Sequence, residues 1–154
     1  MLPSEAALLV VDDNEDNRYT LTRRLKRLGY TNFTTAECGR EALDLIEQQP
    51  FDLVLLDVMM PKLSGFEVCK QLKDDPETSR VMILMVTALN ELGDIERAVS
   101  AGTDDFLSKP VNKIELLKRV ENMLKLKGTE DELERLRQYI QDMEDAPGQG
   151  PGAG

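Results

Sequence analysis

Short apolar stretches alternate with amphipathic patterns along most of this 154-residue chain, and the alternation limits its possible folds more than any other feature. The stretches of strand length lie at 6–12, 32–36, 52–57, 81–88 and 104–110. Each is followed by residues with helical spacing, at 17–29, 39–49, 66–73, 95–102 and 112–127. Consecutive parallel strands are joined by right-handed crossovers that lay each helix back on the sheet. We therefore predict an α/β fold with a doubly wound, five-stranded parallel sheet covered by helices on both faces, since a closed barrel would need eight such units.

Polar side chains stand where four of these strands end. Asp12 and Asp13 follow the first strand, Asp57 the third, Thr87 the fourth and Lys109 the fifth. In an open parallel sheet the functional crevice lies at the carboxyl ends of the strands, so we expect these side chains to meet there. Taken singly, each also has an ordinary structural explanation as a turn former, a helix cap, a strand residue or a solvated loop residue.

The three acids in this set predict a metal site. Two carboxylates about 5 Å apart repel each other by roughly 3 kcal/mol at an effective dielectric near 20, and Lys109 alone cannot balance Asp12, Asp13 and Asp57. Mg²⁺ takes oxygen ligands and binds through a few carboxylates while keeping some of its waters. We therefore expect Mg²⁺ and Lys109 to prepare the crevice for an anionic group.

A calcium-binding loop is the competing metal site. Asp12, Asn14 and Asp16 match the first ligand positions of an EF-hand loop. However, Asn17 stands where that loop requires glycine, and Arg23 stands where it requires glutamate. The pattern therefore argues against an EF-hand.

Composition narrows the partners and the chemistry. A net charge of -10 disfavours binding to nucleic acid or to anionic membranes. The apolar runs are too short for a membrane span and the N-terminus lacks the positive start of a signal peptide, so we expect a cytoplasmic protein. The chain has no histidine, and Cys38 and Cys69 lie far apart. A zinc site and a thiol–imidazole nucleophile are therefore not expected, and any imidazole chemistry must come from another molecule.

Five motifs in order resemble the receiver domains of two-component response regulators, over about residues 6–127. They are "LLVVDDNEDNR", "DLVLLD" followed by "VMMPKLSG", "FEVCKQLK", "ILMVTAL" and "GTDDFLSKP". The resemblance implies a flavodoxin-like sheet of strand order 2-1-3-4-5, followed here by a C-terminal helical extension. It also implies a phosphorylation switch in histidine-aspartate phosphorelay signalling, in place of a dedicated enzyme.

The resemblance assigns roles to the acids of the crevice. Asp57 corresponds to the phosphoacceptor, which receives a phosphoryl group from a phosphohistidine on a sensor kinase or a phosphotransfer protein. Asp13, Asp57 and the backbone carbonyl of Met59 correspond to direct Mg²⁺ ligands. Asp12 corresponds to a residue that acts through a coordinated water.

It also assigns roles to the residues around the phosphoryl group. Lys109 corresponds to the cation that pairs with a phosphoryl oxygen, and the bond before Pro110 resembles one held cis in the family. Thr87 and the backbone N–H of Ala88 correspond to further phosphoryl contacts, besides the backbone of Met59. Thr87 and Phe106 correspond to the switch pair, in which the aromatic ring turns inward when the threonine moves. Phe106 as an ordinary core residue is the alternative.

Two positions that vary within the family tune the lifetime of the phosphoryl group, and here they are Met59 and Leu89. Because both side chains are apolar, we expect them to hinder attack by water. Faster decay of the phosphorylated form in a variant carrying both Met59→Ala and Leu89→Ala would support this, and unchanged decay would refute it.

The chain after residue 127 has a different character. We predict a receiver domain at 1–127, a helical extension at 128–145 interrupted from the preceding helix by Gly128, and a flexible tail at 146–154. The apolar positions of the extension follow coiled-coil spacing: Leu126, Leu133, Leu136, Ile140 and Met143. They indicate either a homodimer through the C-terminal helices or a stripe that packs on the chain's own receiver. This segment is too short and too acidic for a DNA-binding output domain.

Several functions remain open from the sequence. The leading one is a phosphoacceptor that signals by conformational change and protein contact. Alternatives are a phosphorelay intermediate and the receiver fragment of a longer protein with an enzymatic output domain. A carboxylate–metal phosphohydrolase is disfavoured because its second aspartate would stand at Met59, and a degenerate interaction module is disfavoured by the completeness of the site.

Overall fold

The computed structural model describes residues 2–88 and 92–145. Its strands are β1 (Leu8–Val11), β2 (Phe33–Ala36), β3 (Leu53–Leu56), β4 (Met82–Thr87) and β5 (Asp105–Ser108). Its helices are α1 (Glu15–Arg27), α2 (Gly39–Gln48), α3 (Gly65–Asp74), α4 (Leu92–Ala101) and α5 (Lys113–Asp145). Every predicted strand and helix is present, with boundaries that differ by a few residues, except that α5 runs far beyond residue 127.

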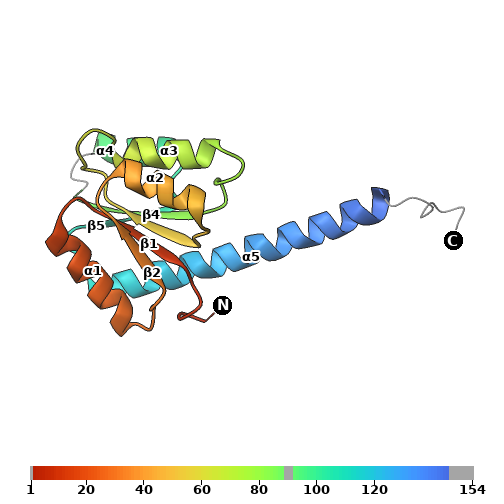
Figure 1. Cartoon of the computed structure of the whole chain (residues 1–154), viewed down its shortest axis with the longest axis horizontal. Coiled ribbons are helices and arrows are strands. Elements are labelled where there is room, and N and C mark those ends of the chain that lie inside the picture. The colour runs from red at the N-terminus through yellow and green to blue at the C-terminus, as the bar shows by residue number, and fades with distance from the viewer. Residues whose placement is uncertain (1, 89–91, 146–154) are drawn as a thin grey trace, which may run out of the picture.

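The strands form one parallel sheet in the order β2-β1-β3-β4-β5 (Figure 1). This confirms the predicted doubly wound α/β fold and its strand order. After β1 the chain adds β2 on one side of that strand, and it then returns to the other side of β1 to form β3. The strand order therefore reverses between β1 and β3. The crevice beyond their carboxyl ends is therefore the place where a ligand site is expected.

The two faces of the sheet carry separate hydrophobic cores, because successive strand residues point to opposite faces. Leu9, Val54 and Ile83 pack with α2, α3 and α4 on one face. Leu8 and Leu55 pack with α1 and the first part of α5 on the other. With both faces covered, the central strands read as continuous apolar runs, as parallel strands do. Cys69 lies in the first core and Cys38 is half-buried, and neither forms a disulfide.

Helix α1 begins as its sequence suggests. Asn14 is the N-cap, and its side-chain oxygen accepts a hydrogen bond of 3.0 Å from the backbone N–H of Asn17. Glu15 and Asp16 stand in the first turn, where they interact favourably with the helix dipole. The structural explanation for Asn14, a helix cap, is thus confirmed, and the first turn of α1 is fixed directly after Asp12 and Asp13.

Helix α5 is continuous, so the predicted interruption at Gly128 is wrong as a helix break. A glycine in a helix interior costs only about 1 kcal/mol relative to alanine, and the surrounding residues are strong helix formers. Lys127 and Asp131 also form an i,i+4 ion pair of 3.0 Å across this position.

Of the two alternatives for the apolar stripe, packing on the chain's own receiver is wrong for the extension. Figure 1 shows α5 projecting away from the sheet, and residues 132–145 are all exposed. The predicted tail at 146–154 lies outside the described residues, as does Leu89. None of the helices in the described ranges combines the length and the apolar character that a membrane span requires.

Candidate functional site

The sheet brings together residues that are far apart in the sequence. In the parallel pairing of β1 with β3, Val11 lies opposite Leu56, so Asp12 and Asp57 leave adjacent strands at the same level. The backbone N–H of Asp57 donates a 2.9 Å hydrogen bond to the carbonyl of Val11. The register of the two strands therefore places both carboxylates at the mouth of one crevice.

The three predicted acids form one cluster. Asp12, Asp13 and Asp57 each offer a carboxylate oxygen, and these oxygens lie within 4.8 Å of one another. Asp12 and Asp57 are buried, with 1% and 5% exposure, whereas Asp13 is exposed. An all-oxygen donor set, partly buried and partly open to solvent, fits Mg²⁺, which keeps several waters when it binds a protein.

Within the described ranges, Lys109 is the cation that forms ion pairs with this cluster. Its Nζ lies 2.9 Å from Asp12 Oδ2 and 3.7 Å from Asp57 Oδ2. Its backbone N–H donates to the carbonyl of Thr87, and the bond from Lys109 to Pro110 is cis, as expected. The ammonium group of Lys109, which directly follows β5, therefore faces both buried carboxylates.

Backbone N–H groups orient the two buried carboxylates. The N–H of Asn14 donates to Asp12 Oδ1 at 2.9 Å, and the N–H of Met59 donates to Asp57 Oδ1 at 3.3 Å. Each bond uses one oxygen of its carboxylate, so Oδ2 of both residues remains directed toward Lys109. The Met59 side chain is 72% exposed at the rim of the crevice.

Burial raises the pKa of the Asp57 carboxyl above its usual value, and the negative charge of Asp12 raises it further. Lys109, the N–H of Met59 and the hydroxyl of Thr87 act in the opposite direction, but they do not cancel the increase. A cation placed among these carboxylates would favour the ionised form of Asp57.

Thr87 ends β4 beside the acids and is fully buried. Its Oγ1 forms no hydrogen bond with any described residue, although the hydroxyl is near enough to Asp57 to lower the pKa of that carboxyl. An unpaired buried hydroxyl is uncommon because it has lost its water without gaining a partner. Thr87 is therefore positioned to donate to an additional oxygen bound beside Asp57.

The remaining predicted residues lie around Thr87. Phe106, on β5, is half-buried and packs against the core formed with α2, α3 and α4, so it is neither a fully buried core residue nor a free surface ring. Ala88 follows β4 and is exposed. The structure thus brings together the acids, Lys109 and Thr87, and it places Phe106 one strand away.

Two residues of this region were given no role by the sequence analysis. The guanidinium of Arg18 donates a 2.6 Å hydrogen bond to the backbone carbonyl of Asp12 and pairs with Glu37. Gly65 packs directly against the backbone that carries Asp57. Arg18 lies one turn into α1 after the acidic pair, and Gly65 follows a turn that contains a proline. Both positions can be recognised in the sequence, but the sequence does not show which groups they contact.

Gly65→Ala is expected to lower stability by about 1–3 kcal/mol, as overpacking does. A Cβ at this position would overlap the carbonyl oxygen of Asp57 and lie 2.7 Å from Val58 Cα, so the loop must move. The free energy of unfolding from denaturant titration measures the effect. Gly128→Ala is the matched control, because its Cβ meets nothing within 4 Å. Equal behaviour of the two variants would contradict the proposed close approach.

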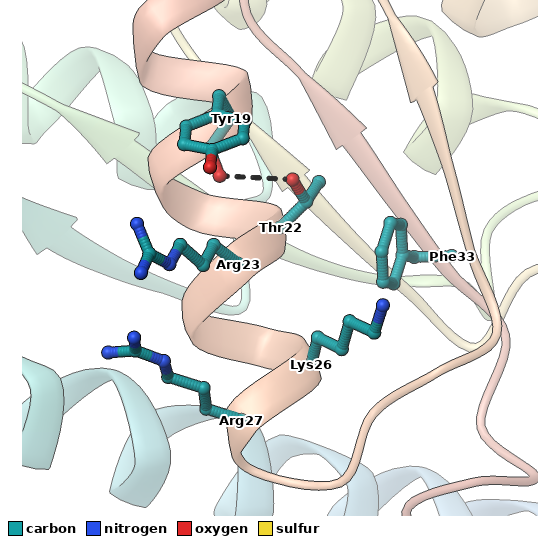
Figure 2. A pocket seen from close by; sticks show the side chains of 6 residues that line it. All are labelled: Tyr19, Thr22, Arg23, Lys26, Arg27 and Phe33. Carbon is teal, nitrogen blue, oxygen red and sulfur yellow. Dashed lines mark hydrogen bonds between the residues drawn. The ribbon is translucent and has the colours of Figure 1, made fainter.

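Two surface grooves flank α1. One of about 610 Å³ lies between α1 and Phe33, and Figure 2 shows Lys26 extending toward that ring while Arg23 and Arg27 extend from another side of the helix. Phe33 is the first residue of β2, so this groove lies at the amino ends of the strands, away from the acids. A second groove of about 490 Å³ runs between α1 and Lys109–Val111, and it opens directly beside the site.

Comparison with known proteins identifies the family. Residues 8–121 match the family model of the response regulator receiver domain, and the chain belongs to that family. It is 41% identical over 128 residues to the response regulator PleD of Caulobacter vibrioides, covering 83% of this chain and 28% of that protein. It is 33% identical over 138 residues to a probable cyclic di-GMP phosphodiesterase of Vibrio cholerae, covering 90% of this chain and 31% of that protein. The chain thus spans less than a third of these two relatives.

Solved structures agree with the family. The chemotaxis protein CheY4 of Vibrio cholerae superposes with a TM-score of 0.71 at 32% identity, covering 77% of this chain and 98% of that one. The receiver domain of the sensor histidine kinase PA1611 of Pseudomonas aeruginosa gives a TM-score of 0.72 at 30% identity, covering 78% and 98%. That structure is described as having a magnesium ion coordinated in the active site cleft. The carboxylates of Asp12, Asp13 and Asp57 in this chain form a donor set that fits the same ion.

Proposed function

We propose that this chain accepts a phosphoryl group on Asp57 from a phosphohistidine of a partner protein. The observation that carries the proposal is the arrangement around this buried carboxylate. Lys109 Nζ lies 3.7 Å from it, and the buried Thr87 hydroxyl beside it has no hydrogen-bond partner in the described chain. These groups suit a phosphoryl group, whose three oxygens share a double negative charge and need positive charge and donors at fixed positions.

In the transfer step Asp57 Oδ2 attacks phosphorus, and the bond between phosphorus and the donor imidazole nitrogen breaks. The electron pair of that bond stays on the imidazole nitrogen. Because the other ring nitrogen of the donor carries a proton, the products are a neutral histidine and an acyl phosphate. Lys109 holds the attacking oxygen and then one phosphoryl oxygen, and Thr87 donates its hydroxyl to another. The backbone N–H groups of Met59 and Ala88 are further donors. The protein's part is thus positioning and charge neutralisation.

Asp13, Asp57 and the carbonyl of Met59 would hold Mg²⁺ directly, and Asp12 would hold one of its waters. When bound, the ion neutralises negative charge that builds up on the phosphoryl oxygens. Asp12 has a second task that needs no metal, because its 2.9 Å ion pair with Lys109 holds the ammonium at the crevice.

The phosphorylated state would alter the surface around α4 and β5. Donation from Thr87 Oγ1 to a phosphoryl oxygen draws the end of β4 toward Asp57 and leaves space into which Phe106 can turn. Phe106 is half-buried beforehand, so a small rotation changes how much of it is exposed. A new local charge is thereby converted into a different surface for protein partners.

The test is incubation of the full chain with Mg²⁺ and acetyl phosphate, followed by intact mass. A stable gain of one phosphoryl group supports the proposal. Continuous release of inorganic phosphate without accumulation would favour a phosphohydrolase, and no reaction would favour an interaction module that never accepts phosphate.

The groove between α1 and Lys109–Val111 is the surface that we expect the phosphohistidine-bearing partner to contact, because Lys109 lines it and lies 3.7 Å from Asp57. Thr20→Arg, which narrows this groove, is expected to slow phosphotransfer from a cognate protein donor at least tenfold while leaving the rate with acetyl phosphate unchanged. Tyr19→Arg is the matched control, since the adjacent exposed residue lines the other groove (Figure 2). Equal transfer rates in the two variants would place the contact elsewhere.

The position of this domain within a signalling protein is a separate question. The PleD and phosphodiesterase relatives are much longer than the matched region, which favours the alternative that this receiver regulates an enzymatic output domain. We propose residues 1–127 as the receiver and 128–145 as a helical connection. Fusing the chain to a reporter enzyme that requires dimerisation, with and without phosphodonor, tests whether phosphorylation is transmitted along α5.

A further inference from the structure

The second half of α5 is a helix that the chain's own receiver does not cover. Among the residues that the structure describes, the last ion pair between the helix and the receiver joins Asp131 to Arg80, which follows α3. Beyond it, residues 132–145 are exposed (Figure 1). Isolated helices of this length are marginally stable in water unless an apolar face is buried. A partner that covered the apolar residues of this segment would therefore stabilise its helical conformation.

Two apolar stripes lie on different sides of α5. The buried stripe comprises Leu116, Val120 and Met123, which pack against the sheet, and Lys127, which is also buried. The exposed stripe comprises Leu126, Leu133, Leu136, Ile140 and Met143, with exposures of 46–56%. At about 100° per residue the two stripes are centred about 140° apart around the helix axis. A partner on the exposed stripe would therefore not compete with the receiver for the same face.

We propose that the partner is a second copy of this chain, aligned parallel and in register along residues 125–144. The exposed stripe places Leu126, Leu133 and Ile140 at a positions of a heptad, and Leu136 and Met143 at d positions. Thr129 is the one polar residue at a core position. Asp131, which is held by the receiver, falls at the outward-facing f position, so the receiver contact and the seam use separate faces.

The charges beside the seam complement each other in a parallel pair. In parallel coiled coils a g residue lies next to the e residue of the following heptad on the other helix, five positions on. This pairs Lys125 with the second copy's Glu130, and Glu132 with its Arg137. Symmetry doubles both pairs. The segment thus supplies opposite charges to itself, which identifies a second copy as the occupant in preference to an unrelated helix.

An antiparallel pair would use these charges differently. With full overlap of the stripes, Glu130 would face Arg137, and Glu132 would face the uncharged Tyr139. Lys125 would have no charged partner within the described helix. The parallel pair satisfies twice as many charges and sets the two receivers side by side at one end of the coiled coil, with both Asp145 residues at the other.

Sedimentation equilibrium on the full chain tests the seam. We expect a dimer for the unmodified chain and for the control Arg135→Glu, which changes the outward-facing c position. Leu136→Glu is expected to give a monomer, because it places a charge at the centre of the seam. Leu136 does not contact the receiver, so circular dichroism should show a folded sheet and phosphoryl acceptance should be unchanged. A monomeric unmodified chain, or a dimeric Leu136→Glu, would overturn the proposal, and neither result depends on whether Asp57 accepts phosphate.

A charge exchange tests the orientation. In a parallel dimer, Arg137→Glu and Glu132→Arg each create two repulsive pairs and are expected to weaken dimerisation about fivefold or more, whereas the double variant restores opposite charges and the original affinity. In an antiparallel dimer, the double variant would stay as weak as Arg137→Glu, because Glu130 would still face a glutamate. Failure of the double variant to recover would overturn the parallel arrangement.

Discussion

Asp57→Asn is expected to abolish incorporation of the phosphoryl group completely, as seen by intact mass after incubation with Mg²⁺ and acetyl phosphate. The amide oxygen of asparagine is a far weaker nucleophile than a carboxylate, and an amide also removes one charge from the set that attracts the metal. The amide can still accept the hydrogen bond from the N–H of Met59, so the loop should keep its conformation. Loss of function should therefore come from lost chemistry while the protein stays folded.

Two controls make this result specific. Asp74→Asn removes an exposed carboxylate at the end of α3, which within the described part of the chain pairs with Lys70 alone. This variant should gain one phosphoryl group like the unmodified chain. Thermal unfolding should show that Asp57→Asn is folded. A phosphoryl gain in Asp57→Asn would mean that another residue accepts the group, and the proposed role of the crevice would be wrong.

The same substitution is expected to raise the melting temperature at neutral pH in the absence of divalent ions. Burial, followed by the charge of Asp12, raises the pKa of Asp57 above its usual value of 3.8. The folded state therefore binds this proton more tightly than the unfolded state, and stability falls as pH rises from the unfolded pKa through the folded one. Asparagine does not ionise and escapes this loss, so the difference in melting temperature should shrink as pH falls toward 3.8. A variant less stable than the unmodified chain at neutral pH would contradict this sign.

Lys109→Gln is expected to slow phosphorylation by about a hundredfold, which is typical of removing one preorganised donor from a site of developing negative charge. Lys109 is the group that faces Asp12 and Asp57 at 2.9 Å and 3.7 Å, and glutamine keeps its approximate length without its charge. The rate of mass gain at saturating Mg²⁺ measures the effect. Unchanged acceptance would show that the lysine is structural only.

The control for Lys109→Gln is Lys113→Gln, which removes an exposed lysine at the start of α5. This variant should be phosphorylated at the unmodified rate. Removing Lys109 should also lower the melting temperature at neutral pH, because Asp12 and Asp57 then face each other without a cation, and added Mg²⁺ should recover much of that loss. A lysine that acted only by packing would leave the Mg²⁺ dependence of stability unaltered.

Much of the fold followed from local patterns. A strand covered on both faces has a continuous apolar run, as in Leu53–Leu56, and a helix that lies on a sheet has apolar residues at helical spacing, as in α1. Both patterns arise from the geometry of a few neighbouring residues. The break predicted at Gly128 was wrong because a single unfavourable residue is outweighed by the favourable propensities and the ion pair around it.

The candidate site divides differently. The amino-acid sequence indicated that Asp12, Asp57 and Lys109 stand at strand ends, since each follows an apolar run. The sequence did not predict the contact of Gly65 with the Asp57 backbone, or the hydrogen bond from Arg18 to the carbonyl of Asp12. Such contacts depend on how separate helices and strands pack against one another. The hydrophobic periodicity within a single helix or strand contains no information about that packing.

The sequence by itself therefore determined the elements, the sheet class, the acidic strand ends and the heptad spacing of the C-terminal helix. Only the tertiary structure decided that Asp12 and Asp57 share one crevice, that Lys109 lies closer to Asp12, and that burial raises the pKa of Asp57. It also decided that α5 leaves the receiver with its apolar stripe exposed. The reason is that backbone propensity and amphipathicity are set by nearby residues, whereas distance, burial and charge interaction are set by strand register and by packing between elements far apart in the chain.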